Sequence, residues 1–432
     1  MSEHHDRERF IPFRKSEIIQ LLSEKEGFTA GEQEKFRKFC RILESIYHFQ
    51  FHSKLEVLKE NYYPLNPDRD IRTLRRYSDD KIGQCEDSLL QMLGEILNKA
   101  NYEEVTEEEL TYALKKESLF KISLFVDFKD FEKQIIFRRG SRTDKVKIKK
   151  WFFREIPAEV EVYERVALVV KFRDAAYFEK NRRRDLKFQP GTMIVKLFKD
   201  IPKADMEMLF PNTQVRMKFK DLLIMIGCAI GGGVTVILKA GAGLIALFTV
   251  LWFMTHSFVA TGGKMPSLDP ARISAMVGGI SALAAIAAFL VKQWNSYKNR
   301  KIRFMKTLGD NLYFKNLDNN AGVFHRIIDE AEEEECKEAI LGYAFLLRSE
   351  RGLSEVELDK AVEQWFAQKC GIGIDFEIND ALRKLGELEL CHESGTNPDG
   401  EIIWQGISLD NACKRLDESW DDFFQISGNA AI

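Results

Sequence analysis

Three observations predict an α+β membrane protein with water-soluble parts before and after a transmembrane helical hairpin. Residues 222–254 and 273–291 are long apolar runs, although charged residues make up 30% of the 432-residue chain. Apolar residues recur at three- and four-residue steps between residues 36 and 51, which is typical of an amphipathic helix. Between residues 160 and 172 the period changes to two, which predicts a half-buried strand or a hairpin of two strands.

Residues 1–120 are predicted to form an N-terminal helical region. Phe36, Leu43 and Phe51 share one helix face, and that helix should break at residues 63–68, because each of the two prolines there disfavours helix in the residue before it. Helical periodicity resumes between residues 82 and 97. Thr106, followed by three glutamates, predicts a capped helix start with acids near the positive end of the helix dipole.

Residues 121–221 predict a small, mostly antiparallel sheet of four or five strands, with a turn at Gly140 and Ser141. The sheet is basic, since residues 138–154 hold eight Lys or Arg and one Asp. Strand edges often carry lysine against edge pairing, and basic residues also attract anionic lipid head groups, so both interpretations stay open. The candidate lipid contacts are Arg138, Arg139, Arg142, Lys145, Lys147, Lys149 and Lys150.

Residues 222–291 predict the membrane region, because about 20 apolar residues cross a hydrocarbon layer of roughly 30 Å. The predicted parts are an interfacial lead-in at 222–233, a crossing at 234–254, a loop at 255–272 and a crossing at 273–291. Three crossings with a turn at Lys239 are the alternative. Both outer flanks are basic, which is the cytoplasmic signature and requires an even number of crossings. Two crossings are therefore favoured.

Two features inside the membrane region bear on function. With two crossings, Lys239 lies near the cytoplasmic end, where its long stem can reach the head groups, and a functional intramembrane charge is the alternative. Ser274, Gly278 and Ala282 form a row of small residues that lets helix backbones approach closely. This row could serve packing within the hairpin or formation of a homo-oligomer.

Residues 292–432 predict an acidic, helical C-terminal domain, since residues 321–432 hold 25 Asp or Glu against 10 Lys or Arg. The order helix, helix, helix, strand, turn, strand predicts a winged-helix-like fold, with a capping box at Ser354 and Glu357 and a turn at 397–400. Its would-be recognition helix is acidic, whereas phosphate binding needs basic residues, so we expect a protein partner and no nucleic acid.

A helix at 322–349 places His325, Asp329 and Glu333 at successive four-residue steps. Such a face could hold a metal or relay protons, but we expect an exposed, salt-bridged surface. No catalytic constellation is evident in the sequence. We therefore expect no enzyme, no cofactor and no metal site.

Two stretches of the sequence resemble the transmembrane protein 143 family. They are residues 196–218 and, after the membrane region, residues 312–326 with 331–339. The similarity covers roughly residues 120–424. It implies a two-pass membrane protein that is mitochondrial in animals, with bacterial and plant relatives grouped under a domain of unknown function. It implies no catalytic residues.

Together these features predict a membrane-anchored interaction or regulatory protein with both termini on the cytoplasmic side. One alternative is a lipid-surface binding protein or enzyme that uses the basic sheet, and another is an oligomeric channel or transporter subunit. We also expect the basic sheet and the acidic C-terminal domain to meet. The start of the chain lacks a signal or transit pattern, which favours a bacterial inner membrane, or an organelle inner membrane in a eukaryote.

Overall fold

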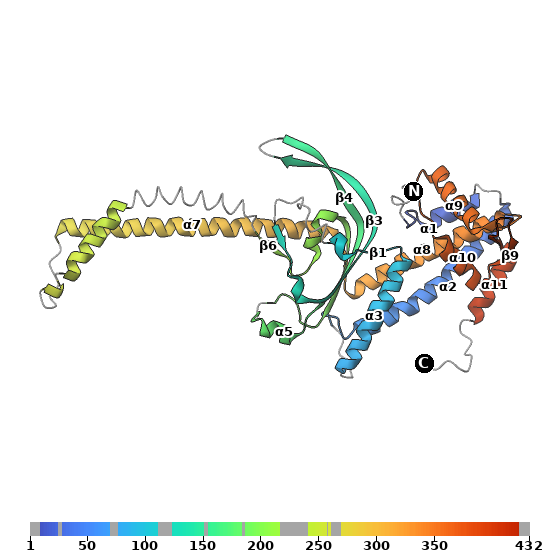
Figure 1. Ribbon diagram of the computed structural model, residues 1–432, viewed down its shortest axis with the longest axis horizontal. Coiled ribbons are helices and arrows are strands. Elements are labelled where there is room, and N and C mark those ends of the chain that lie inside the picture. The colour runs from blue at the N-terminus through green and yellow to red at the C-terminus, as the bar shows by residue number, and fades with distance from the viewer. Residues whose placement is uncertain are drawn as a thin grey trace. The chain divides into compact units, whose positions relative to one another are not determined.

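The computed structural model forms two compact units (Figure 1). It describes residues 9–24, 28–69, 77–110, 123–150, 154–183, 186–216, 241–256, 258–260 and 269–422. Unit 1 comprises Met1–Lys115, Phe128–Met206 and Lys315–Ile432, and unit 2 comprises Lys116–Asp127 and Glu207–Phe314. Unit 1 therefore contains chain from both sides of the apolar runs.

The predicted N-terminal helices are present in unit 1. They are α1 (Lys15–Glu24), α2 (Ala30–Tyr62) and α3 (Asp79–Lys99). A capping box between Thr29 and Glu32 starts α2, and α2 ends directly before the predicted proline break. The apolar face of α2 is buried, as its periodicity predicts, and its buried residues include Phe36, Leu43 and Phe51. At Thr106 the structure also confirms the predicted capped start, because Thr106 and Glu109 exchange hydrogen bonds.

A five-stranded antiparallel sheet confirms the predicted sheet and extends it. Its order is β1 (Glu103–Glu104), β3 (Phe131–Lys150), β4 (Arg154–Phe172), β5 (Met193–Pro202) and β7 (Asn316–Asn319). Residues 160–172 belong to one strand and not to a hairpin of two. The edge strands β1 and β7 lie in sequence outside the predicted sheet region, on either side of it.

The two faces of the sheet are covered differently. Val169, Val195 and Leu197 point into the core shared with the helices. On the other face, Phe172 stacks on Phe188 at 3.9 Å between ring centroids, and Phe178 of α5 (Ala175–Lys180) packs on the same ring. A short 3-10 turn, η1 (Phe128–Asp130), leads into β3. The outermost β4–β5 pair is Val162 with Pro202, and beyond it β3 and β4 continue as a two-stranded ribbon (Figure 1).

The predicted turn at Gly140 and Ser141 is wrong. Both residues lie inside β3, where Arg139 pairs with Arg165 and Ser141 with Tyr163 in one continuous register. Gly140 has a φ of +68°, and a Cβ there would lie 2.9 Å from Glu164 Oε2. The glycine is needed for this conformation and close approach within a strand, because residues with a Cβ disfavour positive φ.

Unit 1 ends with a helical region in the predicted order. It contains α8 (Ala321–Arg348), β8 (Leu353–Ser354), α9 (Glu355–Cys370), α10 (Ile378–Glu387), β9 (Cys391–Thr396), β10 (Ile402–Gly406) and α11 (Leu409–Asp422). The Ser354–Glu357 capping box is present, and Gly400 N donates to Asn397 O in the predicted turn. The N-cap residue of α10 is Glu377. The three short strands form a sheet of order β8-β10-β9.

The central helix of unit 1 is α8, which contacts α1, α2, α3, α9 and α10 (Figure 1). One core cluster joins buried residues of the N-terminal helices, the sheet and the C-terminal helices. The acidic region after the apolar runs and the basic sheet before them thus belong to one folded body, as the sequence led us to expect.

Unit 2 contains the apolar helices. One runs over Gly241–Ala260 and the other is the first part of α7 (Pro270–Lys315). The first continues past the predicted crossing that ends at residue 254, and the second begins three residues before the predicted start at residue 273. A pair of short strands, β2 (Ser123–Phe125) and β6 (Gln214–Arg216), also lies in this unit. The 3-10 segment η3 (Lys203–Leu209) joins β5 to it.

Replacing Gly140 by alanine tests the strained position in β3. We expect Gly140→Ala to lower the free energy of unfolding by about 1–2 kcal/mol, because a Cβ disfavours positive φ by that amount. Urea unfolding followed by circular dichroism measures the loss. Gly83→Ala in α3 is the matched control: no atom lies within 4 Å of its added Cβ, so the helix should gain up to about 1 kcal/mol. Equal effects of the two changes would contradict this role of Gly140.

Candidate functional site

A buried ionic cluster on α8 is the most unusual polar feature of unit 1. Glu334, Glu335 and Glu338 are only 3%, 2% and 3% exposed, and Lys337 is 3% exposed. A buried charge is costly unless it is paired and hydrogen-bonded. These side chains must therefore find partners on other elements.

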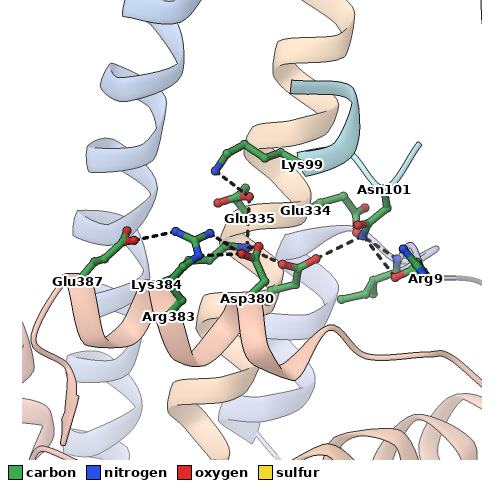
Figure 2. Close-up of polar contacts among 11 residues, drawn as sticks. Arg9, Lys99, Asn101, Glu334, Glu335, Asp380, Arg383, Lys384 and Glu387 are labelled. Carbon is green, nitrogen blue, oxygen red and sulfur yellow. Dashed lines mark hydrogen bonds and ion pairs between the residues drawn. The ribbon is translucent and has the colours of Figure 1, made fainter. Parts of the chain in front are cut away.

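The partners of the cluster come from four other segments (Figure 2). Lys384 of α10, itself 2% exposed, hydrogen-bonds to Glu338 and lies 3.3 Å from Glu335 and 2.7 Å from Asp380. The other contacts involve α3, the residue after α3 and the N-terminal segment. They are Lys99 Nζ to Glu335 at 3.2 Å, Asn101 Nδ2 to Glu338 at 3.3 Å, Ile11 N to Glu334 at 3.1 Å and Lys337 Nζ to Ile11 O at 2.8 Å.

Burial and neighbouring charges change the proton affinity of this cluster. Burial raises the pKa of Glu338 to about 7, and although Lys384 opposes this shift, the carboxylates of Glu334 and Glu335 add to it. For Lys384, burial acts to lower the pKa, but the Glu338, Glu335 and Asp380 carboxylates outweigh it and raise the pKa well above its ordinary value. The cluster therefore contains a carboxyl group that changes charge near neutral pH.

A polar cleft of about 840 Å³ lies beside the cluster. Its walls come from the N-terminal segment, the end of α3 and the start of α10, and include Arg9, Lys99, Asn101, Glu377, Asp380 and Arg383. Arg9 Nη1 lies 3.2 Å from Glu377, and Arg383 is bound by Asp380 and Glu387. The cations that line the cleft are already paired with carboxylates, so the cleft has no preformed anion site in the described residues.

A second carboxylate of α8, Glu330, contacts the basic sheet. It accepts a hydrogen bond from Tyr102 Oη at 2.6 Å and lies 3.2 Å from Arg139 Nη2 and 3.8 Å from Arg165 Nε. The Arg139 side chain is only 10% exposed, and its guanidinium lies over the rings of Tyr102 and Phe10. The basic sheet and the acidic helix thus meet through partly buried ion pairs.

Three of the other candidate lipid contacts are also paired with carboxylates. Arg138 lies 2.8 Å from Glu103, Arg142 lies 2.8 Å from Asp200, and Lys145 lies 3.9 Å from Glu159. For Lys147, Lys149 and Lys150 the structure describes only backbone, in β3, and the β3–β4 register places Pro157, Glu155 and Arg154 opposite them. By backbone register, acidic residues of β4 thus stand opposite part of this basic strand.

Some of the small residues of the hairpin lie where its two helices contact each other. A Cβ added to Gly243 would lie 2.9 Å from Gly278 O and 3.4 Å from the Cβ of Ala282, and one added to Gly279 would overlap the Cβ of Leu247. Ser274 instead donates to Ala271 O within its own helix. Lys239 and the predicted lead-in at 222–233 lie outside the described residues.

The sequence did not reveal that Glu334, Glu335 and Glu338 are buried, or that Glu330 contacts the sheet. His325 and Asp329, on the face considered for metal or proton relay, are exposed. A usable signal was present, because Ala331, Cys336 and Ala339 interrupt the acidic run with small apolar residues, and all three are buried. Among the described residues, no group of three or more His, Cys, Asp or Glu is arranged to hold a metal ion.

One family model matches part of the chain. It is described as "Protein of unknown function (DUF3754)" and matches residues 163–322. The matched region begins in β4, includes β5, both apolar helices and β7, and ends at the start of α8. This part of the chain is thus similar to an uncharacterised domain family, and the resemblance to the transmembrane protein 143 family stays a prediction. No solved structure matches the chain.

Substituting Arg139 tests whether the basic strand is structural or a free surface. We expect Arg139→Ala to lower the free energy of unfolding by about 3 kcal/mol, because it removes the cation from the largely covered carboxylate of Glu330. Lys145→Ala is the matched control on the same strand. The Lys145 side chain is 80% exposed, so this change should stay within about 0.5 kcal/mol. Urea unfolding measures both, and a neutral Arg139→Ala would exclude the structural role.

Adjacent glycines in α7 test the hairpin packing. Gly279→Ala should lower the thermal unfolding midpoint of the detergent-solubilised protein, because its Cβ would overlap Leu247. Gly278→Ala adds a Cβ with no atom within 4 Å, so the midpoint should stay the same or rise slightly. The prediction fails if the two variants unfold at the same temperature.

Proposed function

We propose that this chain is a two-pass integral membrane protein that anchors an interaction or regulatory module, with both flanks of the hairpin on the cytoplasmic side. The observation that carries the proposal is the pairing of β5 with β7. β5 comes before the apolar helices and β7 comes after them, and Lys196 pairs with Asn319 in one antiparallel register. The chain therefore leaves unit 1 and returns to it at neighbouring strands.

The composition of the two helices supports membrane insertion. Gly241–Ala260 and Pro270–Asn299 are 20 and 30 residues long, with mean hydropathy of 1.8 and 2.1. At about 1.5 Å per residue both are long enough for a hydrocarbon layer of roughly 30 Å. Only 6% and 11% of their most apolar windows are buried, whereas the core helix of a water-soluble protein would be mostly buried.

The β5–β7 pair also favours two crossings over three. An odd number of crossings would put β5 and β7 on opposite sides of the membrane and would break their hydrogen bonds. Residues 292–306 of α7 follow the predicted second crossing at 273–291 and contain six basic and no acidic residues, which favours the cytoplasmic side. Which membrane holds the protein stays a prediction of the sequence.

For the C-terminal region, we propose a winged-helix-like module that binds a protein partner. The order α8, β8, α9, α10, β9, β10 and the sheet order β8-β10-β9 support this fold. In α10, Arg383 is paired with Asp380 and Glu387, and Lys384 is buried, so neither is available to a phosphate backbone. The pairing of Arg138, Arg139 and Arg142 likewise favours the module over the alternative of a lipid-binding basic sheet.

Cysteine accessibility in native membranes tests the proposed topology. In a background with Cys228, Cys370 and Cys413 replaced by serine, single cysteines are placed at Lys187 before the hairpin, at Glu350 after it and at Ser267 between its helices. A membrane-impermeant maleimide should label Lys187→Cys and Glu350→Cys from one side and Ser267→Cys from the other. Lys187 and Glu350 are both exposed in unit 1, so labelling of one shows that the maleimide reaches the side on which the other is expected.

Two results would overturn the proposal. Labelling of Lys187→Cys and Glu350→Cys from opposite sides would exclude an even number of crossings. Release of the whole protein from membranes at alkaline pH without detergent would exclude integral insertion.

A further inference from the structure

Residues 9–14, which precede α1, form an irregular segment whose backbone is bound by side chains of α8. The Ile11 N–H donates to Glu334 Oε2 at 3.1 Å, and the Ile11 carbonyl oxygen accepts from Lys337 Nζ at 2.8 Å. Glu334 and Lys337 also pair with each other at 2.7 Å, and each is only 3% exposed. A buried ion pair thus holds both backbone polar groups of one residue, as a neighbouring β-strand would.

The apolar side chains of this segment are also received by the fold. Ile11 is 1% exposed and belongs to the core of unit 1. Phe13 stacks on Phe366 of α9, with 6.0 Å between the ring centroids. The guanidinium of Arg139 lies 5.2 Å from the centroid of the Phe10 ring. Backbone hydrogen bonds combined with side-chain pockets are the means by which proteins recognise an extended peptide.

The first described residue of the segment, Arg9, lies in the wall of the polar cleft (Figure 2). Its Nη1 lies 3.2 Å from Glu377, and its Nε lies 3.8 Å from Glu103 and 4.0 Å from Asp375. Asn101 Nδ2 donates to its carbonyl oxygen at 3.3 Å. The Arg9 side chain is 47% exposed, and the cleft beside it has a volume of about 840 Å³, which lies in the range of ligand sites.

We propose that this groove recognises an extended, basic protein segment with the pattern arginine, aromatic, aliphatic, proline, aromatic, and that residues 9–13 are its resident occupant in the free protein. A partner segment of this pattern displaces the resident and places its own arginine in the cleft. Charge complementarity supports a basic partner. The lining of the cleft contains three cations, one of which is Arg9 itself, and five carboxylates, which are Glu95, Asp359, Asp375, Glu377 and Asp380.

The buried ion pair favours exchange of one segment for another over an empty groove. If residues 9–13 left without a replacement, Glu334 and Lys337 would each lose a hydrogen-bond partner. A buried charged group that loses a partner is costly, so the groove is stable only when a peptide backbone occupies it.

Covalent linkage makes the resident segment autoinhibitory. A linked segment competes at an effective concentration on the order of 1 mM, so a free segment with the same contacts binds the intact chain weakly. A change that weakens the resident should therefore strengthen the binding of a free segment. This inference deepens the proposed interaction module by naming the chemistry of its partner. It rests on that role and not on the membrane topology, because every group involved lies in unit 1.

Fluorescence anisotropy of a labelled peptide with the full-length protein in detergent tests the exchange. The peptide has the sequence of residues 8–15, and a scrambled peptide of the same composition is its control. Ile11→Ala in the chain removes the buried anchor of the resident, so it should tighten peptide binding at least about tenfold relative to the wild type. The same change in the peptide should weaken binding by a similar factor. Arg14→Ala alters an exposed residue of the segment and should leave peptide binding as in the wild type.

Arg9→Ala gives an independent reading if Ile11→Ala folds poorly, because the Arg9 side chain is half-exposed. In the chain it should tighten peptide binding about two- to fivefold, which is the effect of a partly exposed ion pair, and in the peptide it should weaken binding.

Three results would overturn the proposal. They are chain variants Arg9→Ala or folded Ile11→Ala that bind the peptide no more tightly than the wild type, a scrambled peptide that binds equally well, and an Arg14→Ala chain that gains as much affinity as Ile11→Ala. Any of these would exclude this groove as the partner site and leave the membrane anchoring intact, which cysteine labelling tests separately.

Discussion

The need to pair buried carboxylates on α8 organises unit 1. A helix whose acids lie inside the protein is stable only if cations and hydrogen-bond donors reach it from elsewhere. Lys99, Arg139 and Lys384 do so from α3, the sheet and α10, while backbone groups of Ile11 and Lys15 reach it from the N-terminal segment. Segments more than 300 residues apart are thereby tied to one helix. Removing α8 would leave Lys99 and Arg139 without the carboxylates that they contact, and would leave Lys384 with Asp380 of its own helix.

The pairing of β5 with β7 explains how two long apolar helices can interrupt this fold. The chain leaves the sheet after β5, passes through the apolar helices and re-enters as β7 beside β5. The hairpin is thus an insertion between two neighbouring strands, and the core of unit 1 does not depend on apolar helix surface. Because β7 leads directly into α8, the returning chain delivers the central helix to partners that come before the hairpin in sequence.

Periodicity predicted the elements of the fold well, because it reports local burial. The faces of α2 and β4 and the capped helix starts at Thr106 and Ser354 follow from spacing alone. Spacing does not show which residues contact each other across the fold. The acidic pattern of α8 predicts a solvent-exposed helix, and only the structure places Arg139 and Lys384 beside its carboxylates. Gly140 was misassigned for a related reason: glycine permits both a turn and a positive φ within a strand, and only the β3–β4 register distinguishes them. The short strands β1 and β7 carry no periodic signal.

Asn320 connects the sheet to the central helix α8. This single residue separates β7 from α8, and its backbone has a φ of 52° and a ψ of −127°. Such a conformation is costly for a residue other than glycine, so the surroundings must hold it. Tyr62 Oη and Val195 N donate to its side-chain oxygen at 2.9 and 3.3 Å, its amide nitrogen donates to Asp68, and its backbone N–H donates to Val195 O. Because both α2 and β5 fix this bend, the direction of α8 is set by the fold of unit 1 and not by the helix that precedes it. The buried acids therefore keep their partners whatever direction α7 takes.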